Sequence, residues 1–276
     1  MALNNLVVVS DLHCGCRLGL CPPEPQPLME GGQYAPSDLQ RRVWEWWREF
    51  WTDFVPEVCH DEPYAVLVNG ETIDGVHHRS TTQVSQNLED QRSIAVAVLS
   101  EVAQRCAGQL YVISGTPAHS GEQGVDDEAV AKAVKAIPDE TGRHARYVGW
   151  FRIGTALVNA THHIGTTGSQ HYESTAAHKE LVEAFVEAGR WRNEPPDFVV
   201  RSHRHRYLTT SLATHKGFAA SIVTPGWQLK TPFAYKIPGG RQSEPQFGGI
   251  VIRQGDREAY FRQWVRSLAR PKEVLL

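Results

Sequence analysis

The chain lacks any apolar run long enough to cross a bilayer, and none of its 276 residues form a stretch typical of a linker between domains. Its first apolar segment, residues 6–9, is too short for the hydrophobic part of a secretory signal and is followed at once by Asp11 and His13. We therefore expect neither an export signal nor attachment to a membrane.

An excess of charge of one sign is also missing. Lys and Arg number 28 and Asp and Glu number 31, which leaves a formal net charge of -3. The overall charge therefore does not indicate a nucleic-acid-binding protein, and only a local basic patch would support that function.

Cysteine is scarce and odd in number, at five residues. An odd count without an export signal favours reduced thiols over a disulfide framework, so we predict a cytoplasmic protein. Hydrophobic residues make up 41% of the chain, which is enough for one large core. We predict a single domain over residues 1–276, with the Pro- and Gly-rich loop 14–36 and an aromatic helix 37–55 as an insertion.

Short apolar segments alternate with helical patterns in the first half of the chain. They predict strands at 6–9, 65–68 and 110–113, and helices at 82–106 and 126–136 as well as the aromatic helix, which is expected to stop at Pro56. Beyond residue 147 strands dominate, with one more helix at 174–188. This order predicts an α/β fold with a largely parallel first sheet and a second, mixed sheet.

Acids and histidines follow these strands in Gly- or Ser-containing turns. The clusters are Asp11-Leu12-His13, Gly70-Glu71-Thr72-Ile73-Asp74, Gly115-Thr116-Pro117-Ala118-His119, His162-His163 and Ser202-His203-Arg204-His205. Carboxylate and imidazole together are ligands of divalent Mn, Fe and Zn, and ligand sites of open α/β sheets lie at strand carboxyl ends. Five clusters offer more ligands than one ion needs, which points to two adjacent metals and to displacement at phosphorus.

The ordered series resembles the calcineurin-like metallophosphoesterase superfamily over about residues 6–206. The resemblance implies a four-layered α/β/β/α sandwich with two mixed β-sheets. It also implies two divalent metal ions, for which we expect Mn, with Fe or Zn as alternatives. By position, Asp11, His13 and His205 would hold the first metal, Glu71 would bridge, and His162 and His203 would hold the second.

Three positions depart from the family pattern. Glu71 stands where the family has Asp, Ser202 where it has Gly, and Thr116 where it has the Asn that binds the second metal. A hydroxyl is a poor ligand, so we expect His119 near the second metal, either as its ligand or as a proton donor. Adjacent residues of an extended segment point apart, so His162 rather than His163 is expected to bind metal.

The remaining polar residues near the clusters suggest roles in proton transfer and substrate binding. A histidine can give a proton to the leaving oxygen at neutral pH, and the candidates are His119, His77 and His78. Contacts to phosphate are expected from Arg79, His171, Arg204 and Lys230. Asp74 is expected to orient a metal-binding histidine, and residues 224–230 are expected to line the substrate cleft.

The helix 37–55 carries a largely aromatic face that includes Leu39, Trp46, Trp47 and Phe50. It is typical of core packing, but a subunit interface or a base-stacking surface stays open. If the face is a subunit interface, the protein forms a homo-oligomer through this helix.

Together these features predict a divalent-metal-dependent phosphoester hydrolase that uses a metal-activated hydroxide. A phosphodiesterase or nuclease is the first choice, because the basic residues of 201–206 are suited to a phosphate backbone and nucleic acid would then be the partner. The alternatives are a phosphatase of nucleotides or other small phosphomonoesters, and an inactive metal-binding scaffold.

Overall fold

The computed structural model of the chain describes residues 3–77, 79–165, 170–236, 243–269 and 272–274. His78, one of the candidate proton donors, lies outside the described residues.

The first sheet contains six strands in the order β13-β12-β1-β4-β5-β6. Their bounds are β1 (Asn5–Val9), β4 (Ala65–Asn69), β5 (Leu110–Ile113), β6 (Ala145–Arg146), β12 (Gln246–Gln254) and β13 (Ala259–Ser267). Strands β1, β4, β5 and β6 are parallel, whereas β12 and β13 add an antiparallel edge. The predicted largely parallel first sheet is confirmed.

The second sheet contains five strands in the order β10-β11-β9-β8-β7. Their bounds are β7 (Gly149–Ile153), β8 (Ala156–Ala160), β9 (Phe198–Arg201), β10 (Leu208–Thr214) and β11 (Gly217–Val223). The pairs β8–β9 and β9–β11 are parallel and the outer pairs are antiparallel, so this sheet is mixed, as predicted. A small hairpin of β2 (Gln26–Pro27) and β3 (Gln33–Tyr34) lies apart from both sheets.

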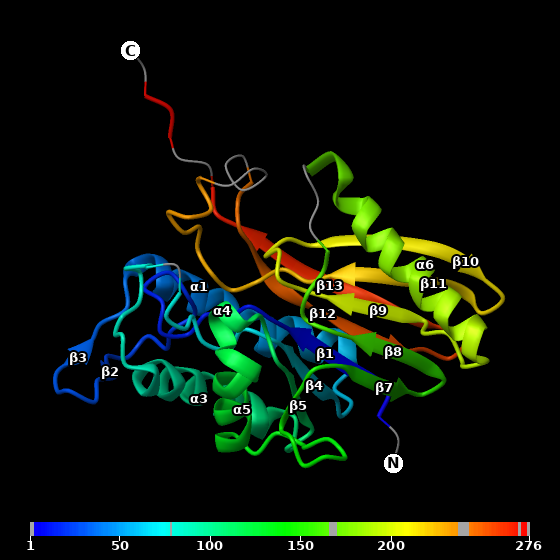
Figure 1. Ribbon diagram of the computed structural model, residues 1–276, viewed down its shortest axis with the longest axis horizontal. Coiled ribbons are helices and arrows are strands. Elements are labelled where there is room, and N and C mark those ends of the chain that lie inside the picture. Colours follow the sequence, from blue (N-terminus) through cyan, green and yellow to red (C-terminus); the bar gives the residue numbers. More distant parts are fainter. Residues whose placement is uncertain (1–2, 78, 166–169, 237–242, 270–271, 275–276) are drawn as a thin grey trace.

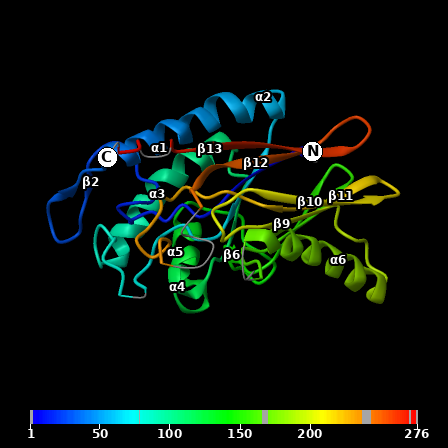
Figure 2. The ribbon, with the colours of Figure 1, turned by 90° about the horizontal axis from the view of Figure 1, so that it is seen from above.

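Helices cover the outer faces of the two sheets, which face each other (Figures 1 and 2). The helices are α1 (Asp38–Glu49), the π-helix η1 (Phe50–Phe54), α2 (Val55–Cys59), α3 (Leu88–Arg105), α4 (Pro117–Ser120), η2 (Glu122–Gly124), α5 (Val125–Ala133), η3 (Gln170–Tyr172) and α6 (Glu173–Trp191). Helix α6 packs on β10 and β11 of the second sheet, whereas α1, α2 and α5 pack on the first. The predicted four-layered α/β/β/α sandwich is confirmed.

Strand alternation explains the layers. In β1, Val7 and Val9 face the core under the helices, while Leu6 and Val8 face the core between the two sheets. Because side chains of a strand point alternately to its two faces, an uninterrupted apolar run is suited to a strand buried on both sides.

The aromatic helix begins as predicted, with Ser37 and Gln40 forming a capping box. The expected stop at Pro56 is wrong, because the helix continues to Cys59. The π-helix η1 ends at Phe54, so Pro56 falls in the first turn of a new α-helical segment, where its missing N–H costs little.

Other helix bounds also differ from expectation. Helix α5 ends at Ala133, before the predicted residue 136. The helix predicted over 82–106 begins only at Leu88, because the Asn87 side chain accepts a hydrogen bond from the N–H of Glu89 and caps it. Helix α6 runs to Trp191, beyond the predicted residue 188. Among the helices of the described residues, none has the length and apolar character needed to cross a membrane.

The aromatic face of α1 and η1 is part of the core. Trp47 and Phe50 are fully buried, and the Trp47 ring lies edge-on to Trp227 at 4.8 Å. Trp227 also stacks with Trp264 of β13 at 6.1 Å. Leu39, expected on the same face, is instead 52% exposed near the start of α1.

Candidate metal centre

The carboxyl ends of five strands meet at one place between the two sheets. Asp11 follows β1, Glu71 follows β4 and Thr116 follows β5, while His162 follows β8 and His203 follows β9. The backbone ties the first two ends together, because the N–H groups of Asp11 and His13 donate to the carbonyls of Gly70 and Glu71. This convergence is the placement expected for a ligand site of an α/β sheet.

Most of the predicted ligands have left-handed backbone conformations. The φ angles are 54° at Asp11, 46° at His13, 56° at Glu71, 73° at His203 and 51° at His205. Such conformations cost non-glycine residues about 1–3 kcal/mol each and persist where the surroundings enforce them. Because this backbone strain is concentrated at residues whose side chains form one polar cluster, it supports a functional role for the cluster.

A first group of possible ligands consists of Asp11, His13, Glu71 and His205. The Nε2 atoms of His13 and His205 lie 3.1 Å apart. His13 Nε2 is 3.1 Å from Glu71 Oε2, and His205 Nε2 is 3.3 Å from Asp11 Oδ1. Two imidazole nitrogens and two carboxylates therefore face one point.

A second group consists of Glu71, His162 and His203. Glu71 Oε1 lies 3.2 Å from His162 Nε2 and 3.6 Å from His203 Nδ1. Its other oxygen, Oε2, faces His13 of the first group. Each oxygen of Glu71 thus faces a different group, which is the arrangement required of a bridging carboxylate.

Buried polar atoms in these groups lack hydrogen-bond partners among the described residues. They are Asp11 Oδ1, His162 Nε2 and His203 Nδ1. A buried polar group without a partner is costly, and a metal ion is one of the few partners that several converging acceptors can share. The donor set of imidazole nitrogen and carboxylate oxygen fits divalent Mn, Fe or Zn.

The electrostatics of the cluster favour a bound cation. Burial lowers the pKa of His13, but hydrogen bonds to Asp74 and Glu71 outweigh burial and raise that pKa to about 10. For His162, burial is likewise outweighed by the charges of Glu71 and Asp11, which raise its pKa to about 9. In the metal-free protein the carboxylates therefore stabilise His13 and His162 in their protonated, positively charged form. A metal ion that binds there would displace these protons.

Asp74 serves as an outer carboxylate behind the first group. Its Oδ1 lies 3.2 Å from His13 Nδ1 and accepts a hydrogen bond of 3.1 Å from Gln228 Nε2. Its Oδ2 accepts a hydrogen bond of 2.7 Å from Gln83 Nε2. Because His13 Nδ1 is held in this way, its Nε2 is directed to the first group.

His119, which the sequence predicts near the second metal, lies beside His13 of the first group. Its Nδ1 donates to the carbonyl of Asp74 at 2.6 Å, and its ring lies edge-on to His13 at 4.5 Å. The short helix α4, which begins at Pro117, takes the chain towards Asp74 before His119 is reached. Burial first, and then the charge of His13, lower the pKa of His119 to about 4, so its Nε2 carries a lone pair.

The other predicted histidines separate into near and distant ones. His77 is near, with Nε2 at 3.6 Å from Asp74 Oδ2 and its ring 4.3 Å from His119. His163 is exposed and touches the ring of His203 at 4.9 Å, outside both groups. His171 is exposed in η3, without a contact to the groups among the interactions of the described residues.

The predicted phosphate-binding cations occupy different surroundings. Arg79 is exposed and has a left-handed backbone. Arg204 is held by a hydrogen bond from Nη2 to the carbonyl of Gly165, and its Nη1 is buried without a partner among the described residues. Lys230 Nζ lies 4.1 Å from the centre of the Tyr235 ring.

Three polar residues, Asn69, Ser202 and Thr224, hold the two sheets together at the site through contacts that the sequence does not predict. Asn69 Nδ2 donates to Ser202 Oγ at 2.7 Å and to the carbonyl of Thr161 at 3.1 Å. Ser202 Oγ also lies 2.7 Å from Thr224 Oγ1. The carbonyl of Asn69 accepts a hydrogen bond from His162 Nδ1 at 2.6 Å and so directs Nε2 to Glu71. The departure from the family at Ser202 was visible in the sequence, but its partners were not.

The segment 224–230 lies next to the ligands but is largely buried. The N–H of Trp227 donates to the carbonyl of Asp11 at 2.9 Å. A Cβ at Gly226 would lie 3.0 Å from the Cβ of Asp11 and 3.1 Å from the Cγ of His205. The segment therefore supports the ligands from behind, with Lys230 at its half-buried end.

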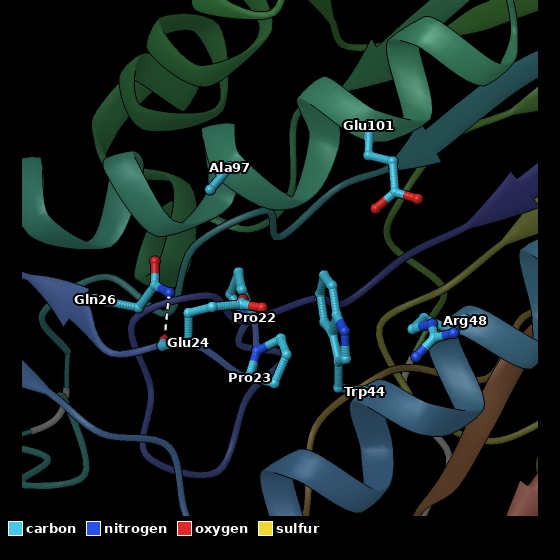
Figure 3. A pocket seen from close by; sticks show the side chains of 8 residues that line it. All are labelled: Pro22, Pro23, Glu24, Gln26, Trp44, Arg48, Ala97 and Glu101. Atoms are coloured by element: carbon cyan, nitrogen blue, oxygen red, sulfur yellow. Dashed lines mark hydrogen bonds between the residues drawn. The ribbon is translucent and has the colours of Figure 1, made fainter.

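A cavity of about 490 Å³ lies elsewhere, between the 14–36 loop, α1 and α3. Figure 3 shows Pro22 and Pro23, Trp44 and Arg48 of α1, and Glu101 of α3 around it. None of its lining residues belongs to the two groups of possible metal ligands.

No protein-family model matches the chain, and no curated protein matches it either. Three similar solved structures cover nearly all of it. Vacuolar protein sorting 29 from Cryptosporidium parvum is 11% identical over 97% of this chain and 100% of that chain, with a TM-score of 0.37. A predicted phosphoesterase from Streptococcus pneumoniae TIGR4 is 12% identical over 96% of this chain and 99% of that chain, with a TM-score of 0.33.

The third, a Thermotoga maritima protein solved in solution by NMR, is 11% identical over 96% of this chain and 100% of that chain, with a TM-score of 0.41. These identities and scores are too low to assign any chemistry to the site. By fold and by the order of its motif residues, the chain resembles the calcineurin-like metallophosphoesterases.

Proposed function

We propose that the chain is a phosphoester hydrolase that depends on two divalent metal ions and acts on phosphodiesters. The observation that carries the proposal is the position of Glu71, whose two oxygens face two separate groups of buried ligands. Asp11, His13 and His205 would hold the first ion together with Glu71, and His162 and His203 would hold the second. The mixture of nitrogen and oxygen ligands suits Mn, with Fe or Zn as alternatives.

Two ions bound there would supply Lewis-acid polarisation of a phosphoryl oxygen and an acidified water. The protein's own contribution is to fix the ligands. His13 is oriented by Asp74, and His162 by the carbonyl of Asn69. Because both rings are held through Nδ1, no reorientation is needed when an ion binds.

A proton must reach the leaving oxygen, and the imidazoles beside the first group are placed to carry it. His119 presents the lone pair of Nε2, since its Nδ1 donates to the Asp74 carbonyl, so it would first accept the proton released by the acidified water and then pass it on. His77 packs against the His119 ring. We propose these two as the proton-handling pair, with His78 as the third candidate from the sequence. Arg79, His171, Arg204 and Lys230 are the proposed contacts to the rest of the substrate.

A second candidate, a phosphatase of nucleotides or other small phosphomonoesters, is favoured by the pairing of the basic residues in 201–206. Arg201 Nε donates to Glu180 Oε2 at 3.0 Å, and Arg206 pairs with Glu173. Guanidinium groups occupied within the protein are less available to a phosphate backbone. These ion pairs weaken the hypothesis of a nuclease more than that of a phosphodiesterase with a small substrate.

We also propose how the protein could form a homo-oligomer and in which compartment it is found. Most of the aromatic face of α1 and η1 packs inside the chain, so a homo-oligomer formed through this helix would have to use Leu39 and the half-buried Trp44. All five cysteines are buried and unpaired, which supports a reducing compartment such as the cytoplasm.

The test is hydrolysis of bis-p-nitrophenyl phosphate and of p-nitrophenyl phosphate by chelator-stripped protein, with and without Mn²⁺. His203→Ala removes a ligand, and His215→Ala, at an exposed histidine between β10 and β11, is the matched control. We expect Mn-dependent cleavage of the diester that His203→Ala abolishes and His215→Ala keeps.

Cleavage of the monoester alone would support the second candidate. Absence of turnover on both compounds would overturn the proposal, and Mn²⁺ binding in a calorimetric titration of the same protein would then support the inactive metal-binding scaffold.

A further inference from the structure

Thr116 contacts the bridging carboxylate directly. Its hydroxyl lies 2.5 Å from Glu71 Oε1, and its N–H donates to the same oxygen at 3.4 Å. The hydroxyl is the donor, because a carboxylate oxygen can only accept. Oε1 is also the oxygen that faces His162 and His203.

The loop that carries Thr116 is held rigidly by Asp127, a buried residue of α5. Asp127 Oδ2 accepts hydrogen bonds from the N–H of Gly115 at 2.7 Å and from the Ser120 hydroxyl. Asp127 Oδ1 accepts from the N–H of Thr72 at 3.0 Å, one residue after Glu71. One carboxylate therefore fixes the turns of both Thr116 and Glu71, so the contact between these two is set by the fold.

The two ligand groups differ in the number of side chains that they contain. Among the residues that the structure describes, the first has four side chains, Asp11, His13, Glu71 and His205, whereas the second has three, Glu71, His162 and His203. The proton of the Thr116 hydroxyl is committed to Glu71, and a neutral hydroxyl is a poor ligand for a divalent cation. Its hydrogen bond also draws electron density from the oxygen that the second ion would share.

We infer that Thr116 makes the two metal sites unequal: it positions the bridging Glu71 without supplying a ligand, so the second site binds its ion more weakly and keeps more open coordination positions. The inference rests on the proposed two-metal function and adds a regulatory consequence to it. The chain holds one ion tightly, and the second ion, bound by three side chains, sets the divalent-metal concentration at which activity appears.

The experiment is a stepwise titration of chelator-stripped wild-type protein with Mn²⁺, followed by calorimetry and by electron paramagnetic resonance. We expect two binding steps whose dissociation constants differ by at least about tenfold, the lower end of what single changes around a metal site produce. The first equivalent should give the signal of isolated Mn²⁺. The second should reduce that signal, because two ions about 3.5–4 Å apart couple magnetically.

Substitutions at position 116 separate a positioning role from a merely structural one. Thr116→Asn adds an amide oxygen, and we expect the second step to tighten by about tenfold or more while the first step keeps its constant. Thr116→Ser retains the hydroxyl and is the matched control, with both constants close to those of the wild type. His203→Ala should remove the second step alone.

The outcomes distinguish this inference from the proposed function. Two equal tight sites in the wild type, or an unchanged second step in a folded Thr116→Asn variant, would overturn the inference and leave the two-metal proposal standing. Absence of Mn²⁺ binding in the wild type would overturn both.

Discussion

Metal removal should destabilise the protein by an amount that can be worked out in advance. A ligand that binds only the folded state stabilises it by RT ln(1 + [L]/Kd), which is about 2.7 kcal/mol when Mn²⁺ is present at 100 times the Kd. If the second site binds tenfold more weakly, the same concentration adds about 1.4 kcal/mol. The stripped protein should therefore be less stable than the loaded protein by about 4 kcal/mol.

The chain length converts this difference into a temperature. Unfolding entropy near 60 °C is about 2.1 cal/mol/K per residue, which for 276 residues gives about 0.58 kcal/mol/K. The first ion should then raise Tm by about 5 °C and the second by about 2 °C.

Thermal unfolding of stripped protein, measured with increasing Mn²⁺, tests these values. The chelator EDTA should reverse the rise. His203→Ala should lose only the smaller shift, and His205→Ala, which removes a ligand of the first group, should lose most of the larger one. Each variant is compared with its own stripped form, because removing a histidine also changes the metal-free protein. The exposed His215→Ala variant should behave as the wild type.

A rise in Tm smaller than about 1 °C at a saturating Mn²⁺ concentration would refute the reasoning, since it would mean that the ligand groups do not bind an ion in the folded state. Equal shifts in His203→Ala, His205→Ala and His215→Ala would refute the assignment of residues to sites.

Two further substitutions test the packing around the centre. In Gly115→Ala, the added Cβ would lie 2.5 Å from the Cγ of Glu71 and displace the bridging carboxylate, so calorimetry should show Mn²⁺ binding weakened by about tenfold or more. Little change in affinity would mean that Glu71 is not a ligand. Trp47→Ala should lower the free energy of unfolding by about 3–5 kcal/mol in urea, because Trp47 is fully buried against Trp227 and Trp51. Trp44→Ala, at a half-buried position, should cost far less, and equal costs would contradict the core assignment.

The positions of the candidate ligands could be predicted because they depend on strand order alone. Short apolar segments predict buried strands, and a polar cluster after each parallel strand must lie at the same edge of its sheet. Asp11, Glu71 and His162 satisfy these conditions, and His162 Nε2 lies 3.9 Å from Asp11 Oδ1 and 3.2 Å from Glu71 Oε1. The same reasoning could not say which oxygen faces which histidine, since this depends on side-chain rotamers.

Local geometry accounts for the predictions that failed. Pro56 usually ends a helix, but a π-helical turn just before it shifts the hydrogen-bonding pattern, and nothing in the apolar spacing indicates such a turn. His119 lies three residues beyond Thr116, and the turn of α4 between them brings its ring beside His13 of the first group. Both cases depend on a single turn of backbone that a periodic pattern does not resolve.

The aromatic helix and the candidate metal centre are connected through packing contacts that neither residue pattern predicts. Left-handed backbone at Asp11 and His205 costs about 1–3 kcal/mol per residue, so the loops need support from behind. The support is Gly226 and Trp227: the glycine packs against the side chains of Asp11 and His205, and the Trp227 N–H donates to the Asp11 carbonyl. Trp227 is held in turn by the rings of Trp47 and Trp264. The rigid aromatic core therefore enforces the strained loop, which explains why large side chains gather on the far side of the sheet end that carries the ligands.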